Sequence, residues 1–493
     1  MSDSTHRKSP QPDPTLAYLD DAEEFALAVR STWPFRYLRW FLRCSEDELD
    51  LVIAKIYCTS LPVNWTGREG PARTITASIF HPIHILLTKS LFWRPSAPAT
   101  FDLETIDPVY FNRFFAGIHD WLNGTRRISP RHGSAGFSRP DVSESIHGTV
   151  SLRSALLLFL APICIPRLLA LAPRGRALPF LQSFRRTLSV YAQFEGHFRR
   201  YPCRHFVTFS DEENHPSRWL AFKQFCPGSL VAVQNAERCG ARMADPVFAF
   251  GVVDLHLTFG SYMLDVWTTM RGVVTRILTV GSLGLNEFHG PITTALSTPP
   301  AIAHDILVPD QGVRPHNQMP EVFHLAVGKL LGHLHRLKSE RPGLRIAYQL
   351  RHYPAGWETH RNAVVSWLES RYPGTFEILD NPTDRGESYF SILKSELVVT
   401  FASTMGFEAL RLGRKALFVN YSGDPTRTIC ADPRYQIDDP QGNYPEFVSR
   451  IDDLLTLRLD GPPEIALIRH SFFDGRVQDR IAEALNRLEA GAS

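Results

Sequence analysis

The segment at residues 396–420, ELVVTFASTMGFEALRLGRKALFVN, limits the fold of this chain more than any other stretch of the sequence. It reads as an apolar run, a break of small and hydroxyl residues, a short helical stretch and a second apolar run. The first run, residues 397–401, is rich in β-branched residues and suits a strand that is buried on both faces. Strand, helix and strand in this order form a βαβ unit, which requires a parallel sheet covered by helices. The sequence therefore predicts an α/β protein.

The turn after the first of these strands carries polar groups that suit a ligand. Ala402, Ser403 and Thr404 end the strand and offer an N-cap to the helix, which Gly413 can close. The start of a helix at the carboxyl end of a strand favours an anion, typically phosphate, because backbone N–H groups and the helix dipole point there. If Thr404 is the N-cap, Glu408 lies one position beyond the capping-box position, so its carboxylate can reach a ligand hydroxyl such as that of a ribose. The alternative is an exposed glutamate placed for the helix dipole.

The same residues resemble a known donor-binding segment. The string STMGFEAL at residues 403–410, followed by Gly413, is similar to the donor-nucleotide segment of GT-B glycosyltransferases. The likeness is strongest to bacterial surface-carbohydrate (capsule and O-antigen) biosynthesis proteins, and it extends to CDP-glycerol glycerophosphotransferases and nucleotide-sugar epimerases. In those proteins the hydroxyl turn holds the nucleotide-sugar phosphates and the glutamate pairs with ribose hydroxyls. The resemblance implies donor-binding roles for Ser403, Thr404, Gly406 and Glu408.

Length and composition permit such an architecture. A chain of 493 residues is too long for one ordinary core and indicates two or three domains. The 53 Lys and Arg residues are almost balanced by 51 Asp and Glu residues, so bulk electrostatics gives no reason to expect a nucleic-acid partner. The seven cysteines lack C-x-x-C or Cys/His spacing, which indicates neither a disulfide framework nor a zinc site. Residues 1–15 are polar and lack the apolar core of a secretory signal, so we expect a cytoplasmic protein.

One apolar stretch, residues 155–165, bears on contact with membranes. Pro166 and Arg167 interrupt it well short of the ~20 residues that a spanning helix needs. The stretch therefore predicts a buried strand or helix. Basic residues nearby also allow peripheral contact with an anionic inner membrane, with a solvated face as the alternative: Arg167, Arg174, Arg176, Arg185 and Arg186.

Four strand-like runs in the first half of the chain end in polar residues or glycine. They lie at residues 205–209, 229–234, 253–259 and 277–280. Because the carboxyl ends of parallel strands meet at one edge of a sheet, we expect the residues that follow to line the acceptor side of a cleft: Gln234, Asn235, Gly260, Gly281 and Ser282. This series resembles the end of the N-terminal domain in the same surface-carbohydrate group. Those proteins commonly have Gln-His-Gly where this chain has Gln234-Asn235-Ala236, so a histidine's role cannot be carried over to Asn235.

The second half of the chain repeats the alternation of strands and helices. Strand-like runs at residues 305–309 and 345–350 flank a strongly helical stretch. The second run ends in the sequence RHYP, where the resembling families have a basic residue, any residue, then His-Pro beside the donor phosphates. The histidine of this chain stands one place early. Arg351 or His352 can still serve a diphosphate, since arginine offers a bidentate fork, and a structural turn before proline is the alternative.

These patterns predict four parts of the chain. A mainly helical addition occupies residues 1–145, a Rossmann-like acceptor domain residues 146–298, and a Rossmann-like nucleotide-sugar domain residues 299–465. Residues 466–493 resemble the closing segment of the same enzymes, which implies a last helix that packs back on the first domain. The predicted fold is therefore α/β with two Rossmann-like domains that face a cleft, as in the GT-B type, and an N-terminal helical addition.

The chemistry of transfer requires a base that deprotonates the acceptor hydroxyl. Asp211, Glu212 and Glu213 follow the run at residues 205–209 and are the candidates, with a solvated acidic loop as the alternative. The chain contains no Asp-x-Asp motif, so we expect no metal, and no cofactor apart from the nucleotide-sugar donor as a substrate. The expected second partner is a glycan or lipid-linked saccharide acceptor.

Three functions remain open at this point. The first is a metal-independent GT-B glycosyltransferase of surface polysaccharide synthesis. The second is a CDP-polyol phosphotransferase or a nucleotide-sugar epimerase on the same scaffold. The third is a non-catalytic sugar-nucleotide-binding subunit, which the missing histidine at Asn235 favours.

Overall fold

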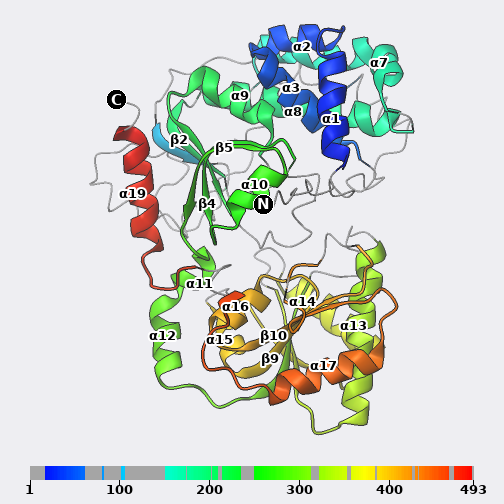
Figure 1. Cartoon of the computed structure of the whole chain (residues 1–493), viewed down its shortest axis with the longest axis vertical. Helices are drawn as coiled ribbons and strands as arrows, with labels where there is room; N and C mark the ends of the chain where they lie inside the picture. Colours follow the sequence, from blue (N-terminus) through cyan, green and yellow to red (C-terminus); the bar gives the residue numbers. More distant parts are fainter. Residues whose placement is uncertain are drawn as a thin grey trace, which may run out of the picture.

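The protein is described by a computed structural model. The described residues are 17–61, 80, 82, 101–105, 150–173, 175–200, 202–208, 214–234, 249–311, 321–351, 357–382, 386–424, 428–430, 432–465 and 471–490. They form two parallel β-sheets and a group of N-terminal helices, which confirms the predicted α/β class. Figure 1 shows the N-terminal helices at one end of the molecule, the first sheet in the middle and the second sheet at the other end.

The first sheet has five strands in the order β1-β2-β3-β4-β5, and all neighbours are parallel. Its strands are β1 (Phe101–Thr105), β2 (Cys203–Thr208), β3 (Ser229–Val233), β4 (Val252–Thr258) and β5 (Val273–Thr279). The last four match the strand-like runs of the sequence. The first, β1, comes from the region predicted to be mainly helical, so that region also supplies an edge strand.

The second sheet has six strands in the order β11-β10-β9-β6-β7-β8, again with parallel neighbours. Its strands are β6 (His304–Pro309), β7 (Ile346–Gln349), β8 (Glu377–Leu379), β9 (Ser395–Thr400), β10 (Lys415–Asn420) and β11 (Gln436–Asp438). The chain runs outward from β6 to β8, then returns to β9 on the other side of β6. Counted along the chain, this is the 3-2-1-4-5-6 order of a Rossmann sheet, with its switch point between β6 and β9.

The predicted βαβ unit at residues 396–420 is present as β9, α16 (Met405–Arg411) and β10. Leu397, Val398 and Val399 are fully buried, although successive strand residues point to opposite faces of the sheet. Both faces of β9 are therefore covered, as its continuous apolar sequence requires.

The N-terminal helices pack around α8, the longest of the described helices. The described helices of the first half are α1 (Ala17–Val29), α2 (Phe35–Leu42), α3 (Glu46–Thr59), α6 (Leu152–Leu158), α7 (Leu160–Leu171), α8 (Ala177–Arg200), α9 (Pro216–Phe225) and α10 (Met263–Thr269). A capping box starts α3, because Ser45 Oγ accepts from Glu48 N and Glu48 Oε2 accepts from Ser45 N. The predicted buried strand or helix at residues 155–165 is helical and belongs to α6 and α7.

The other described helices follow β5, and all of them except α19 join the two sheets or cover the second sheet. They are α11 (Leu283–Glu287), α12 (His289–Ser297), α13 (Glu321–Glu340), α14 (Trp357–Arg371), α15 (Glu387–Leu393), α16, α17 (Tyr444–Thr456) and α19 (Val477–Ala490). Two of them, α11 and α12, carry the chain from the first sheet to the second.

The last helix, α19, packs on the first sheet rather than the second. Ile481 and Leu485 of α19 share a core with Val207, Val231 and Leu255 of the first sheet. Residues at the alternate positions of these strands point to the other face of the first sheet. They belong to the larger core, which also contains the N-terminal helices. Figure 1 shows α19, in red, alongside the first sheet. Within the described ranges, the chain therefore passes to the second half through α11 and α12 and is back on the first half at α19. The domain boundaries expected near residues 145, 298 and 465 stay predictions.

Candidate functional site

The switch point of the second sheet lies where the chain leaves β6 and β9 in opposite directions. Gln311, two residues beyond β6, connects the segment that follows β6 to the segment at the end of β9. Its Nε2 donates to Thr400 Oγ1 at 3.0 Å, and its Oε1 accepts from Ala402 N at 3.2 Å. In open α/β sheets ligands bind at this place, outside the carboxyl ends of the strands.

The hydroxyl turn after β9 is held together by local hydrogen bonds. Ser403 N donates to Thr400 Oγ1 at 3.1 Å, and Ser403 Oγ accepts from Met405 N at 3.2 Å. Thr404 occupies the N-cap position of α16 with helical dihedral angles, and its side chain makes no capping hydrogen bond. Ser403 therefore accepts the hydrogen bond of the first helical N–H group. The sequence alone does not decide whether Ser403 or Thr404 is the N-cap. Both hydroxyl residues are half-buried.

Gly406 has a packing role in this turn. A Cβ atom at this position would lie 2.4 Å from Cε1 of Phe418 on β10. A side chain there would push α16 away from the sheet. The absence of a side chain lets the helix start close to β10, and the implied contact of Gly406 with a donor stays a prediction.

Glu408 is buried at the junction of the two halves of the molecule. Its carboxylate Oε1 accepts from Ser282 Oγ at 2.9 Å and from Tyr389 OH at 3.3 Å. Only 5% of the residue is exposed, so the alternative of an exposed glutamate placed for the helix dipole does not apply. Ser282 follows β5 of the first sheet, and Tyr389 lies on α15 beside the second sheet. The hydrogen bond from Ser282 to Glu408 therefore joins the carboxyl end of the first sheet to α16 beside the second sheet.

Gly281 and Ser282 were both predicted to line the edge of the first sheet, and the structure brings them to this junction. Ser282 Oγ also accepts from Leu285 N at 3.2 Å, which caps α11. Gly281 has φ +85°, and a Cβ atom there would lie 2.4 Å from the carbonyl oxygen of Phe472. Where the sequence predicted a cleft between the halves, this part of the interface is closed by direct contact.

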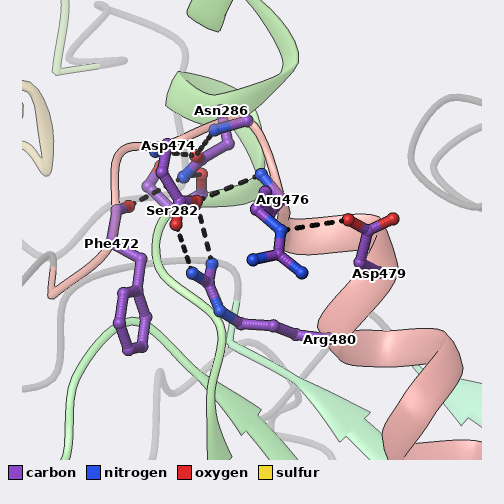
Figure 2. A network of polar contacts seen from close by, with 8 residues as sticks. Ser282, Asn286, Phe472, Asp474, Arg476, Asp479 and Arg480 are labelled. Atoms are coloured by element: carbon purple, nitrogen blue, oxygen red, sulfur yellow. Dashed lines mark hydrogen bonds and ion pairs between the residues drawn. The ribbon is translucent and has the colours of Figure 1, made fainter.

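The segment before α19 is tied to the same junction (Figure 2). Asn286 Nδ2 donates to the carbonyl oxygens of Ser282 and Phe472, both at 2.9 Å. Its Oδ1 accepts from the backbone N–H groups of Asp474 and Gly475, both at 3.2 Å. One amide side chain thus joins the end of the first sheet to the C-terminal segment.

An ion pair fixes the start of α19. The carboxylate of Asp474 accepts from Arg480 Nη1 at 3.0 Å, pairs with Nη2 of the same residue, and accepts from Arg476 N at 3.1 Å. These hydrogen bonds, chiefly the one from Arg480, lower the pKa of Asp474. The Arg480 guanidinium also stacks on the ring of Phe472 at 3.8 Å.

Two other predicted residues of the first sheet have structural partners. Gln234 Nε2 donates to Tyr262 OH at 2.7 Å, and Gln234 Oε1 accepts from Phe259 N at 2.8 Å. The side chain is 2% exposed and ties the end of β3 to the loop after β4. Gly260 is buried in that loop and accepts from Thr258 Oγ1 through its carbonyl oxygen.

Of the six remaining predicted site residues, the structure describes one, and the other five fall outside the described residues. Arg351 is exposed and follows β7, so it lies at the same edge of the second sheet as the switch point. His352 and Asn235 fall outside the described residues, as do the candidate bases Asp211, Glu212 and Glu213. The roles of all six stay predictions.

Sequence reasoning missed a buried polar cluster directly after β6. Asp310 Oδ1 accepts from Tyr348 OH at 3.1 Å, and Asp310 Oδ2 lies 3.5 Å from His360 Nε2. Both ionisable side chains are almost completely buried. Polar residues that follow a buried strand were the signal used for β9, and the same signal at Asp310 and Gln311 would have found this cluster.

Metal ligands were also considered. Across the described ranges, no three His, Cys, Asp or Glu side chains lie close enough together to hold a metal ion. The expectation that the reaction needs no metal stays a prediction.

Comparisons with known proteins return structures alone, since no family model and no curated protein matches the chain. The UDP-GlcNAc 2-epimerase from Neisseria meningitidis has a TM-score of 0.39 and 11% identity, over 62% of this chain and 82% of its own. The wall teichoic acid polymerase TagF has a TM-score of 0.38 and 11% identity, over 86% of this chain and 99% of its own. The trehalose 6-phosphate synthase from Burkholderia multivorans has a TM-score of 0.36 and 11% identity, over 68% and 82%. All three TM-scores are below 0.5, and these likenesses assign no residue a role.

Proposed function

We propose that this protein is a glycosyltransferase that moves a sugar from a nucleotide-sugar donor to a glycan or lipid-linked acceptor in surface polysaccharide synthesis. The observation that carries the proposal is the position of Glu408. This glutamate lies one helical turn from the switch point of a sheet with Rossmann strand order, which is where open α/β sheets bind nucleotides. The sequence resemblance of residues 403–410 to a donor-nucleotide segment supports the same ligand class.

The donor would bind along the carboxyl edge of the second sheet. Its phosphates would lie at Ser403 and Thr404, at the start of α16, with Arg351 as a nearby cation. Its ribose would contact Glu408. That carboxylate already accepts hydrogen bonds from the hydroxyl groups of Ser282 and Tyr389, and two ribose hydroxyls would donate bonds of the same kind. The donor would therefore replace protein hydroxyls without leaving the carboxylate unsatisfied.

The acceptor would approach from the first sheet. Asp211, Glu212 and Glu213 follow β2, and the carboxyl end of β2 lies on the same edge as Ser282 because the sheet is parallel. One of these carboxylates would take the proton of the acceptor hydroxyl. Hydrogen-bond donors and positive charge around the leaving nucleotide phosphate would stabilise the transition state, in place of a metal.

The test is a thermal-shift screen with UDP, GDP, CDP and CMP and with their sugars. We expect at least one of them to raise the melting temperature, because a ligand that binds only the folded state stabilises it. Glu408→Gln should abolish this shift, since the amide is a poorer acceptor for two hydroxyl groups. Ser282→Ala is the matched control: it changes the same junction but leaves the ribose acceptor in place, so the shift should persist.

The proposal fails if none of the nucleotides stabilises the wild-type chain, or if both variants lose the shift equally. Product analysis then separates the classes of enzyme. Nucleoside monophosphate released from a CDP-polyol, or an epimerised sugar that is still attached to its nucleotide, would exclude a glycosyltransferase. Binding with no turnover of any donor would indicate a non-catalytic subunit.

A further inference from the structure

A surface remote from the switch point combines exposed arginines with exposed apolar side chains. We call it the α2–α6 surface and define it by residues of α2, of its C-cap and of the α6–α7 segment: Arg36, Tyr37, Arg39, Trp40, Arg43, Leu152, Arg153, Leu156, Ile163 and Arg167. Figure 1 shows α2 and α7 at the end of the molecule opposite the second sheet. A partner bound there would leave the proposed nucleotide site uncovered.

The first part of this surface is the outer face of α2. Phe35, Leu38 and Leu42 point inward and are completely buried. The outward positions carry arginine or an aromatic residue, and Trp40 is 67% exposed. A surface helix normally turns mixed charged and polar residues to the solvent. Tryptophan and tyrosine beside basic residues are instead typical of side chains at a membrane–water interface.

The second part is the outer face of the α6–α7 segment. Leu152, Leu156 and Ile163 are 53%, 50% and 61% exposed, and spacings of four and seven residues place them on one side of the helical segment. Arg167 follows on the same side and is also exposed. Single exposed apolar residues are common on soluble proteins, but a stripe of them marks an interaction surface.

The two parts adjoin through Arg153 on α6. Its Nη2 donates to the carbonyl oxygen of Phe41 at 2.6 Å, and its guanidinium carbon lies 6.0 Å from the centre of the Trp40 ring. A surface pocket forms at this contact. Four arginines, a tryptophan and a cysteine line it: Arg36, Arg39, Arg43, Arg153, Trp40 and Cys44.

The net charge of the pocket is positive. Arg39 pairs with Glu46, and Arg153 donates to backbone carbonyls. For the side chains of Arg36 and Arg43 there is no hydrogen bond or ion pair within the described part of the chain. Burial raises the pKa of the Cys44 thiol to about 12, so this group adds no negative charge. Arg36 and Arg43 are exposed residues that line the pocket, so it presents positive charge to the solvent.

We propose that the α2–α6 surface binds an anionic lipid bilayer peripherally. The arginines would contact lipid phosphates, Tyr37 and Trp40 would lie at the headgroup level, and the exposed leucines and isoleucine would enter the acyl boundary. A soluble nucleotide fits this pocket poorly, because arginine, tryptophan and a neutral thiol offer no strong acceptor to a ribose or to the donor edge of a base.

The α6–α7 segment lies on the bilayer rather than across it. Leu152–Leu171 is long and apolar enough to span a membrane by length and composition, but 44% of its most apolar 18-residue stretch is buried inside the protein. Ala155, Leu157 and Leu168 are completely buried, in a core shared with Leu188 of α8. Insertion of the whole segment would empty this core. The inner face of the α6–α7 segment therefore remains packed in the protein core, and only its outer face would contact lipid.

The basic residues that the sequence indicated for membrane contact match the α2–α6 surface only in part. Of those named, Arg167 lies on the α2–α6 surface and Arg174 falls outside the described residues. Arg176 instead stacks over the ring of Tyr57 at 4.2 Å. The arginines that line the pocket come from α2, from its C-cap and from α6.

The experiment is flotation of the full chain with phosphatidylcholine vesicles prepared with and without phosphatidylglycerol. We expect binding to the anionic vesicles at low salt and release at high salt, because salt screens the attraction. The double variant Arg36→Gln, Arg43→Gln should lower the partition coefficient roughly thirtyfold, since each basic residue at an anionic surface contributes about fivefold. The double variant Leu156→Ser, Ile163→Ser should also weaken binding.

The matched control is the double variant Lys394→Gln, Arg458→Gln. Both residues are exposed basic side chains of the second half, so the net charge changes equally at a different place. The proposal is overturned if this control loses as much binding as the arginine variant, or if neutral vesicles bind the chain equally well. Retention on vesicles after a high-salt wash would indicate a spanning segment. Displacement by inorganic phosphate, but not by chloride of the same ionic strength, would indicate a site for a soluble anion.

Discussion

At the scale of single residues, Glu408 links the two halves of the molecule. A buried carboxylate is costly unless hydrogen bonds compensate for its lost hydration, and Ser282 and Tyr389 supply two such bonds. Ser282 at the same time caps α11. One serine therefore stabilises both a carboxylate and a helix start.

Ser282→Ala should lower the free energy of unfolding by about 2–4 kcal/mol, the sum of a hydrogen bond to a charged group and a lost N-cap. Urea denaturation measures this change. The control is Ser297→Ala at an exposed position, which should alter stability by less than about 0.5 kcal/mol. An unchanged midpoint for Ser282→Ala would contradict the assigned role.

Gly281 offers a second test at this scale. Both Gly281 and Gly413 have left-handed dihedral angles, with φ +85° and +73°. A Cβ atom at Gly281 would meet the carbonyl oxygen of Phe472, whereas one at Gly413 has nothing within 4 Å. Gly413→Ala should therefore cost only the backbone strain of about 1–2 kcal/mol, and Gly281→Ala should cost more. Thermal unfolding measures both variants. Equal decreases in melting temperature would show that the contact with Phe472 does not affect stability.

At the scale of elements, α19 is held by its core face and by the Asp474–Arg480 pair at its start. Core residues such as Ile481 account for most of this attachment, because they bury apolar area against the first sheet. The ion pair is partly exposed, with 41% of the Asp474 side chain accessible. Its contribution is therefore small, about 0.2–1 kcal/mol.

The stability that comes from this pair should depend on pH in one direction. The folded structure lowers the pKa of Asp474 below its ordinary value of 3.8, so the carboxylate is the favoured form in the folded state. Its contribution is complete above that ordinary value and is lost as the pH falls through the lowered pKa. Asp474→Asn should therefore reduce stability at neutral pH but have a smaller effect in acid. The control is Asp460→Asn at an exposed position, and equal pH profiles for the two variants would contradict this assignment.

At the scale of the whole molecule, the junction couples ligand binding to the contact between the halves. In the proposed function, a ribose and Ser282 compete for the same carboxylate of Glu408. The halves would then separate at this point when the donor binds, while the connection through α19 keeps them together.

This competition makes a prediction about affinity. Ser282→Ala removes the competing hydroxyl, so the nucleotide that stabilises the wild-type chain should bind the variant more tightly, by up to about tenfold. Tyr389→Phe removes the longer hydrogen bond and should act in the same direction but more weakly. Isothermal titration calorimetry measures both changes. Weaker binding to both variants would mean that these hydroxyl groups hold Glu408 in place for the ligand.

Several elements could be predicted from sequence alone because their signals are local. The strand β9 is a continuous apolar run, and its polar end marks a carboxyl edge of the sheet. Patterns over a few residues also predicted the four last strands of the first sheet, and the resemblance of residues 466–493 to a closing segment implied the final helix. By contrast, the strand β1 is five residues long and carries no comparable run, so only its pairing with β2 identifies it.

The contacts that define both proposed sites are long-range. Ser282 and Glu408 are 126 positions apart, and Arg153 and Trp40 are 113 positions apart. The sequence alone predicted that Ser282 lines a cleft and that Glu408 lies in the first turn of a helix, and it assigned nothing to Arg153 or Trp40. Their partnership depends on how the sheets and helices pack, because the free energy of folding selects that packing over the whole chain rather than within any one segment. Sequence thus established the α/β class and the polar turn at residues 402–408, and three-dimensional packing established which residues meet there.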